Sequence, residues 1–117
     1  MPRCDIRYRH ADIPELLAAH AAAITEAIAT VMCTDDPTGE VQPDYVKLEL
    51  NHAPHDINTR DVSVNIGARA LPGRKGRERE IARAVRAAFV AATGGRYSVS
   101  VWVTLSEHST YREYVPG

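Results

Sequence analysis

The chain carries the same order of hydrophobic patterns twice. In each half, apolar and polar residues first alternate, then apolar residues recur at helical spacing, and then the alternation returns. Alternation is typical of half-buried strands, and the longer period is typical of an amphipathic helix. We therefore expect two β-α-β units, at about residues 2–51 and 61–105. The patterns, in chain order, cover residues 4–8, 13–32, 46–50, 62–66, 81–92 and 99–105.

A helix that connects two strands of one sheet makes a crossover, so the strands of each unit should run parallel. Every strand pattern has one apolar face, which predicts that two helices cover one side of a four-stranded sheet. This is an α+β fold in one domain of residues 1–117. The second side of the sheet carries Tyr45, Lys47 and Trp102 beside serines. It is too apolar in places for full exposure to water, so we expect a subunit interface there.

Composition narrows the class of protein. At 117 residues, with 44% hydrophobic and 25% charged residues, the chain can bury a core of ordinary size. No apolar run approaches the roughly 20 residues of a membrane-spanning helix. The first ten residues hold four charged ones, unlike a signal peptide, and two cysteines do not make a disulfide framework. We expect a cytoplasmic protein with no membrane contact.

Charge is balanced overall but uneven along the chain. The net charge is −1, yet residues 69–86 hold seven Arg or Lys against two Glu, and residues 35–61 hold seven Asp or Glu against two basic residues. A local cationic segment suits a small anionic ligand. The balanced total argues against a dedicated nucleic-acid binder.

Position 2 is the first candidate for chemistry. Initiator methionine is removed efficiently before a small residue such as Pro2, and the product has a free secondary amine. An ordinary α-amino group titrates near ~8, and apolar surroundings or nearby cations lower its pKa. A base with a pKa near ~7 is suited to proton abstraction at neutral pH. The alternative is that the proline only begins an edge strand.

The second candidate is the cationic segment "GARALPGRKGR" between the third strand and the second helix. Backbone N–H groups at a helix N-terminus favour anions, and the planar fork of arginine matches a carboxylate. Arg69 and Arg74 are the candidates to hold such a group, and a solvated basic loop is the alternative. His52, His55 and Asp56 form an H-x-x-H-D run without a clear further ligand, which does not predict a metal site.

Together these residues resemble the tautomerase superfamily, and within it most closely 5-carboxymethyl-2-hydroxymuconate isomerase. The resemblance covers nearly the whole chain, and each of its motifs is short. The matching features are the Met-Pro start, the tandem β-α-β halves, "IGA" at 66–68, Gly73-Arg74, Glu78-Arg79, Arg96-Tyr97 and the tail "SEHSTY".

The resemblance implies a homotrimer in which Pro2 is the general base and Arg74 helps to hold a substrate carboxylate. Lys47 stands in the second strand where single-length members have a substrate-binding arginine, but lysine lacks the bidentate fork. The loop is longer than in the family, so Arg69 could take the role of Arg74. Trp102 could supply an apolar wall from a neighbouring subunit.

The implied reaction is a cofactor-independent and metal-independent keto–enol tautomerisation. The neutral amine would move a proton on a 2-hydroxydienoate or an α-keto acid, a step of aromatic degradation, while the cations stabilise the enolate-like charge. Decarboxylation and hydration-dehalogenation, which occur at the same site elsewhere in the superfamily, stay open.

Two other functions stay open. "GRKG" at 73–76 resembles the GxxG loop of a K-homology RNA-binding domain, although Arg79 stands where that fold wants an apolar residue. The chain could also be a tautomerase-like trimer without activity. If Met1 is retained, the nitrogen of Pro2 is an amide and cannot act as a base.

Overall fold

The computed structural model describes residues 2–34, 41–57 and 59–106. Each strand begins within one residue of the alternating pattern that predicted it. The elements, in chain order, are β1 (Arg3–Tyr8), α1 (Ile13–Ala19), α2 (Ala21–Met32), the short 3-10 helix η2 (Pro43–Tyr45), β2 (Lys47–His52), β3 (Val62–Arg69), α3 (Glu78–Ala92) and β4 (Val99–Ser106).

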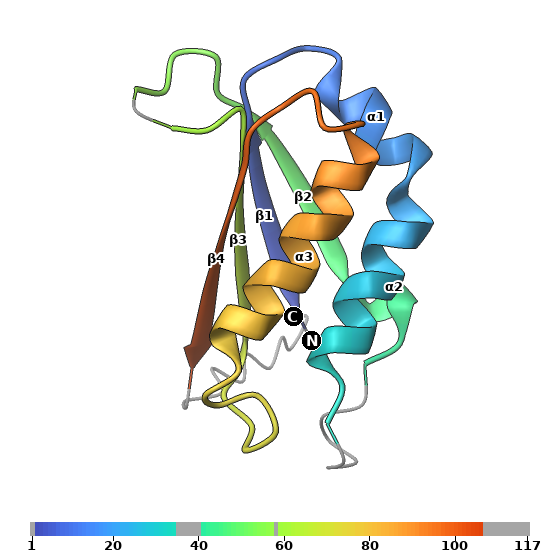
Figure 1. Cartoon of the computed structure of the whole chain (residues 1–117), viewed down its shortest axis with the longest axis vertical. Coiled ribbons are helices and arrows are strands. Elements are labelled where there is room, and N and C mark those ends of the chain that lie inside the picture. The colour runs from blue at the N-terminus through green and yellow to red at the C-terminus, as the bar shows by residue number, and fades with distance from the viewer. Residues whose placement is uncertain (1, 35–40, 58, 107–117) are drawn as a thin grey trace, which may run out of the picture.

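The four strands form one mixed sheet in the order β2-β1-β3-β4 (Figure 1). β1 pairs with β2 in parallel and β3 with β4 in parallel, as predicted for the two β-α-β units. The units meet through the antiparallel pair β1 and β3, in which Arg3 lies opposite Gly67 and Tyr8 opposite Val62. The α+β fold with a four-stranded sheet is therefore confirmed, and β1 is a central strand.

The first predicted helix is in fact two helices, which corrects the expected number of helices from two to three. The chain turns at His20, whose φ of −117° and ψ of 16° are not helical, and α1 and α2 are bent by 69°. The ring Nδ1 of His20 lies 3.0 Å from the carbonyl oxygen of Leu16. The break lets Leu17 of α1 and Ile24 of α2 both reach the core.

No single described helix is long and apolar enough to cross a membrane, and only the bent pair of α1 and α2 passes that test, on length and composition alone. The buried apolar residues of this pair belong to the protein core.

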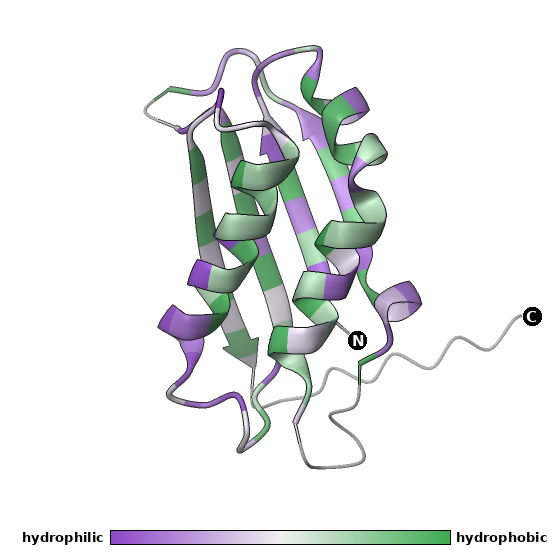
Figure 2. Cartoon of the chain, turned by 45° about the vertical axis from the view of Figure 1, so that its right-hand side comes forward, coloured by the Kyte–Doolittle hydropathy of each residue, from purple (hydrophilic) through white to green (hydrophobic). Residues whose placement is uncertain are grey.

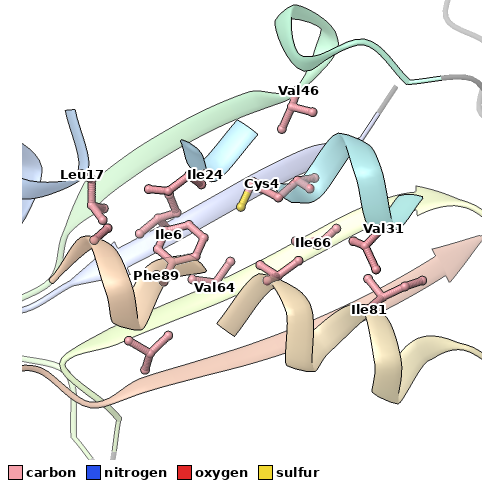
Figure 3. Packing of buried hydrophobic residues seen from close by; sticks show 14 of the residues in the cluster. Cys4, Ile6, Leu17, Ile24, Val31, Val46, Val64, Ile66, Ile81 and Phe89 are labelled. Carbon is pink, nitrogen blue, oxygen red and sulfur yellow. The ribbon is translucent and has the colours of Figure 1, made fainter. Parts of the chain in front are cut away.

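The core fills the space between the helices and one face of the sheet. Figure 3 shows Phe89 of α3 beside Ile6 of β1 and Val64 of β3, with Ile24 of α2 close by. Phe89 and Ile6 have no exposed surface. Burial of such side chains contributes roughly 1.5–3 kcal/mol each and fixes the helices on the sheet.

The opposite face of the sheet, which we call the open face, carries the residues that alternate with the buried ones along each strand (Figure 2). None of the described helices covers it (Figure 1). Trp102 stands there with 73% of its surface exposed. The register places on this face Arg3, Asp5 and Arg7 of β1, Lys47, Glu49 and Asn51 of β2, Ser63, Asn65, Gly67 and Arg69 of β3, and Ser100, Trp102, Thr104 and Ser106 of β4.

Candidate active site

Pro2 stands immediately before the central strand β1 and is buried. Its carbonyl oxygen accepts a hydrogen bond from the backbone N–H of Lys47, with an N–O distance of 3.4 Å. Arg3 pairs with Lys47 on one side and with Gly67 on the other. Pro2 therefore lies between the start of β2 and the end of β3, and the simple reading of an edge-strand proline does not describe its position.

Lys47 lies on the strand beside Pro2, and its side chain is on the open face, where it is 65% exposed. Its Nζ is 3.0 Å from Oε1 of Glu49. The other oxygen of the same carboxylate accepts a hydrogen bond of 2.8 Å from Arg3. The hydrogen bonds from Arg3 and then from Lys47 lower the pKa of Glu49 to about 2. At neutral pH this carboxylate thus partly neutralises the positive charge beside Pro2.

Arg69 is the last residue of β3, on the side of β1 opposite to Lys47. It is exposed, and alternation along β3 directs it to the open face with Asn65 and Gly67. No hydrogen bond or ion pair joins its guanidinium to another residue in the described part of the chain. Arg69 therefore presents an exposed guanidinium near the start of β1.

Arg74 has a different environment from the one its motif predicts. Only 3% of it is exposed. Its Nε donates to the carbonyl oxygen of Met32 at 2.9 Å, and its Nη1 donates to the carbonyl oxygen of Arg69 at 3.0 Å. Desolvation on burial lowers the pKa of this guanidinium. The side chain thus ties the loop before α3 to the end of α2 and to the end of β3.

Trp102 lies on the open face of β4, opposite Asn65, which in turn lies opposite Asp5. Within one chain it is separated from β1 by the strand β3, about 9–10 Å across the sheet. The backbone register therefore places Pro2, Lys47 and Arg69 at neighbouring positions around the start of β1. Arg74 is hydrogen-bonded to the backbone of Arg69, and Trp102 stands on β4, with β3 between it and β1.

Glu49 is a residue near this site that sequence reasoning missed. The signal was present, because Lys47 and Glu49 are two positions apart and so share a face of one strand. What the sequence alone did not reveal is the parallel register, which brings Arg3 to the same carboxylate.

Two of the three residues of the weak metal motif, His52 and Asp56, have other partners. The ring of His52 stacks on Tyr8 with centroids 5.0 Å apart, and Asp56 forms a double hydrogen bond with Arg7 at 2.9 and 3.0 Å. Within residues 2–34, 41–57 and 59–106, no three His, Cys, Asp or Glu side chains are grouped to hold a metal ion. The tail motif, from Glu107 onward, lies outside the described residues.

The Arg96-Tyr97 pair lies at the end of the sheet where β1 finishes and β4 begins. The hydroxyl of Tyr97 donates to both carboxylate oxygens of Asp12, at 2.7 and 2.8 Å, and its ring stacks on His10. This pair is therefore far along β1 from Pro2, and its role within one chain is to join β4 to the start of α1.

One groove of about 590 Å³ opens between α2 and α3. Its lining includes none of the predicted site residues. It is formed by Ala23, Glu26, Ala27, Thr30, Val31, Arg77, Glu80 and Ala84.

Comparison with known proteins finds structures that share the fold of this chain. No family model and no curated protein matches the sequence, but solved structures do match. A 5-carboxymethyl-2-hydroxymuconate delta-isomerase superposes with a TM-score of 0.61 at 18% identity, covering 99% of this chain and 89% of that one. A macrophage migration inhibitory factor-like protein from Entamoeba histolytica gives 0.60 at 12% identity, covering 92% and 89%.

A third structure, a fused 4-OT described as an asymmetric trimer, gives a TM-score of 0.61 at 11% identity, with 89% of this chain and 85% of that chain covered. The chain has the tautomerase fold. The fold that the short motifs implied is thereby confirmed. In the tautomerase fold of this chain, the residue before the first central strand is Pro2.

Proposed function

We propose that this protein is a tautomerase in which Pro2, freed by removal of Met1, is the general base. The observation that carries the proposal is the position of Pro2, buried just before a central strand, with Lys47 and Arg69 on the two neighbouring strands. Val46, which directly precedes Lys47, is apolar and buried. Burial and nearby cations both disfavour a protonated amine, so they favour a neutral base at pH 7.

The proposed substrate is a small carboxylic acid with an enol or a 2-hydroxydiene. The neutral amine of Pro2 takes the hydroxyl proton, the electron pair moves through the double bond as the carbonyl forms, and Pro2 returns the proton to carbon. Arg69 and Lys47 bind the carboxylate and stabilise the negative charge that develops on oxygen. The sequence of steps transfers one proton and no electrons, so it needs no cofactor.

We also propose that three copies assemble through their open faces. Fused 4-OT structures with this fold are described as symmetric and asymmetric trimers. In this chain the open face presents Trp102, with 73% of its surface exposed, and a large exposed aromatic is typical of interface residues. In such a trimer Trp102 of one copy would form an apolar wall for the site of its neighbour.

The test combines intact mass spectrometry with turnover of phenylenolpyruvate and of 2-hydroxymuconate, followed by ultraviolet absorbance. We expect a mass without Met1 and enzyme-dependent ketonisation. Replacing Pro2 by Ala still permits removal of Met1 but leaves a primary amine, and kcat/KM should fall by about 100-fold or more, as for loss of a general base. Pro54→Ala, in an exposed loop, is the matched control and should change nothing. Retention of Met1, or full activity of Pro2→Ala, would falsify the proposal.

A further inference from the structure

Arg74 is the one charged residue within the described part of the chain that is buried. Its two hydrogen bonds to the backbone reach different elements. Nε donates to the carbonyl of Met32 at the end of α2, and Nη1 donates to the carbonyl of Arg69 at the end of β3. A guanidinium is costly to bury unless its donors are satisfied. These bonds satisfy two donors with backbone oxygens of the protein itself.

The end of α2 explains why a cation is stable in this place. The last four carbonyls of a helix have no partner within the helix and form the negative end of its dipole. The carbonyl of Met32 is one of these. An arginine near a helix C-terminus can bond such carbonyls, and its planar fork can reach a second acceptor that a lysine ammonium would miss.

The second acceptor is the carbonyl of the proposed substrate-binding residue. The oxygen of Arg69 accepts from Arg74 Nη1 at 3.0 Å and from the backbone N–H of Leu71 at 2.9 Å. The next residue, Ala70, donates its N–H to Ser106 at 2.8 Å. Three hydrogen bonds thus hold the peptide group that follows Arg69, while the side chain of Arg69 is exposed.

We propose that Arg74 is a positioning residue, which fixes the backbone of Arg69 so that the Arg69 guanidinium meets the substrate carboxylate. This rests on the proposed function. It assigns the arginine of the Gly-Arg pair a role different from the direct substrate contact that the sequence implied. Arg74 acts through Arg69, and Arg69 makes the contact.

Arg77 provides a matched control. Its Nη1 donates to the carbonyl of Gly73 at 2.8 Å, and its Nη2 lies 3.5 Å from the carbonyl of Val31, near the same end of α2. Within the described part of the chain, no side-chain hydrogen bond of Arg77 involves Arg69. A change at Arg77 therefore perturbs the loop and the helix end without removing the bond that carries the proposal.

The experiment measures kcat, KM and melting temperature of the full chain with phenylenolpyruvate for Arg69→Gln, Arg74→Lys, their double variant and Arg77→Lys. We expect Arg69→Gln and Arg74→Lys each to raise KM by about 10-fold, the effect of one lost charge-assisted contact. In the Arg69→Gln background, Arg74→Lys should change KM by less than about 2-fold, because coupled residues are not additive. Arg77→Lys should leave KM unchanged. A KM effect of Arg74→Lys that persists without Arg69, or its absence when Arg69 is present, overturns the positioning role.

A second measurement on the unmodified protein covers the case in which Arg74→Lys does not fold. Side-chain NMR during titration with maleate, a dicarboxylate probe, should shift the Nε signal of Arg69 and leave that of Arg74 unchanged. A shift of Arg74 without one at Arg69 contradicts the proposal. Absence of turnover in the unmodified enzyme refutes the proposed tautomerase, whereas the maleate titration still decides which arginine binds a carboxylate.

Discussion

Asp61 and Ser98 form a three-part hydrogen-bonded junction between the residues that precede β3 and β4. One carboxylate oxygen of Asp61 accepts from the backbone N–H of Ser98 at 3.0 Å and from its hydroxyl at 3.1 Å, and the Ser98 hydroxyl accepts from the backbone N–H of Asp61. The other carboxylate oxygen lies 2.9 Å from Nε2 of His10. This junction fixes the start of the parallel pair in the second half.

The junction predicts a specific loss of stability in acid. The hydrogen bond from the Ser98 backbone, and then the one from His10, lower the pKa of Asp61. A carboxyl with a lowered folded-state pKa stabilises the fold above its unfolded pKa of about 4, and this contribution is lost as pH falls through the folded value. In urea unfolding, Asp61→Asn should therefore lower stability at pH 7 and have little effect near pH 2. Equal losses at both pH values would exclude this linkage. Glu15→Gln, at an exposed position of α1, is the surface control.

The core predicts a large effect of truncating Phe89. This side chain is completely buried among Ile6, Ile24 and Val64 (Figure 3). Phe89→Ala should lower the free energy of unfolding by about 3–5 kcal/mol, from lost burial and from the cavity left behind. Phe89→Leu should cost clearly less. Chemical denaturation measures both, and a loss below about 1 kcal/mol for the alanine variant would contradict the packing described.

Replacement of glycine by alanine should have different effects on stability at Gly73, in the loop before α3, and at Gly67. A Cβ on Gly73 would lie 2.7 Å from both Cβ and Cγ2 of Thr34, whereas one on Gly67 would meet no atom within 4 Å. Gly73→Ala should destabilise the protein by about 1–3 kcal/mol, as overpacking does, and Gly67→Ala should not. Melting temperatures compare the two variants. Equal behaviour would show that the loop does not lie against Thr34.

Removal of the Glu49 carboxylate should lower KM for a carboxylate substrate. Its pKa of about 2 means that it stays ionised across the working pH range and neutralises part of the charge of Lys47 and Arg3. Glu49→Gln should lower KM for a carboxylate substrate by roughly 2–5-fold, because the repulsion between Glu49 and the substrate, although weakened by solvent, would be removed. The added positive potential should also move the acid limb of the pH–rate profile to lower pH. If KM and the pH–rate profile were both unchanged, the charge of Glu49 would have no influence on the site.

The sequence predicted the strands, their parallel pairing and the apolar face of the sheet, because period-2 alternation depends only on which residues are buried. It did not predict the break at His20. Alanine-rich turns on both sides continue the helical pattern, and the break depends on how the two segments pack. The role of Arg74 could not be predicted from the sequence either, because the carbonyl that it bonds belongs to Met32, 42 positions away.

The protonation of the Pro2 nitrogen decides whether this residue can act as the base. ¹⁵N NMR of protein labelled at proline, recorded between pH 5 and pH 10, measures it directly. We predict a secondary-amine signal at Pro2 that titrates near ~7, below the ~8 of an ordinary α-amino group. An amide signal that does not titrate, or an amine that titrates at ~8 or above, would contradict the account.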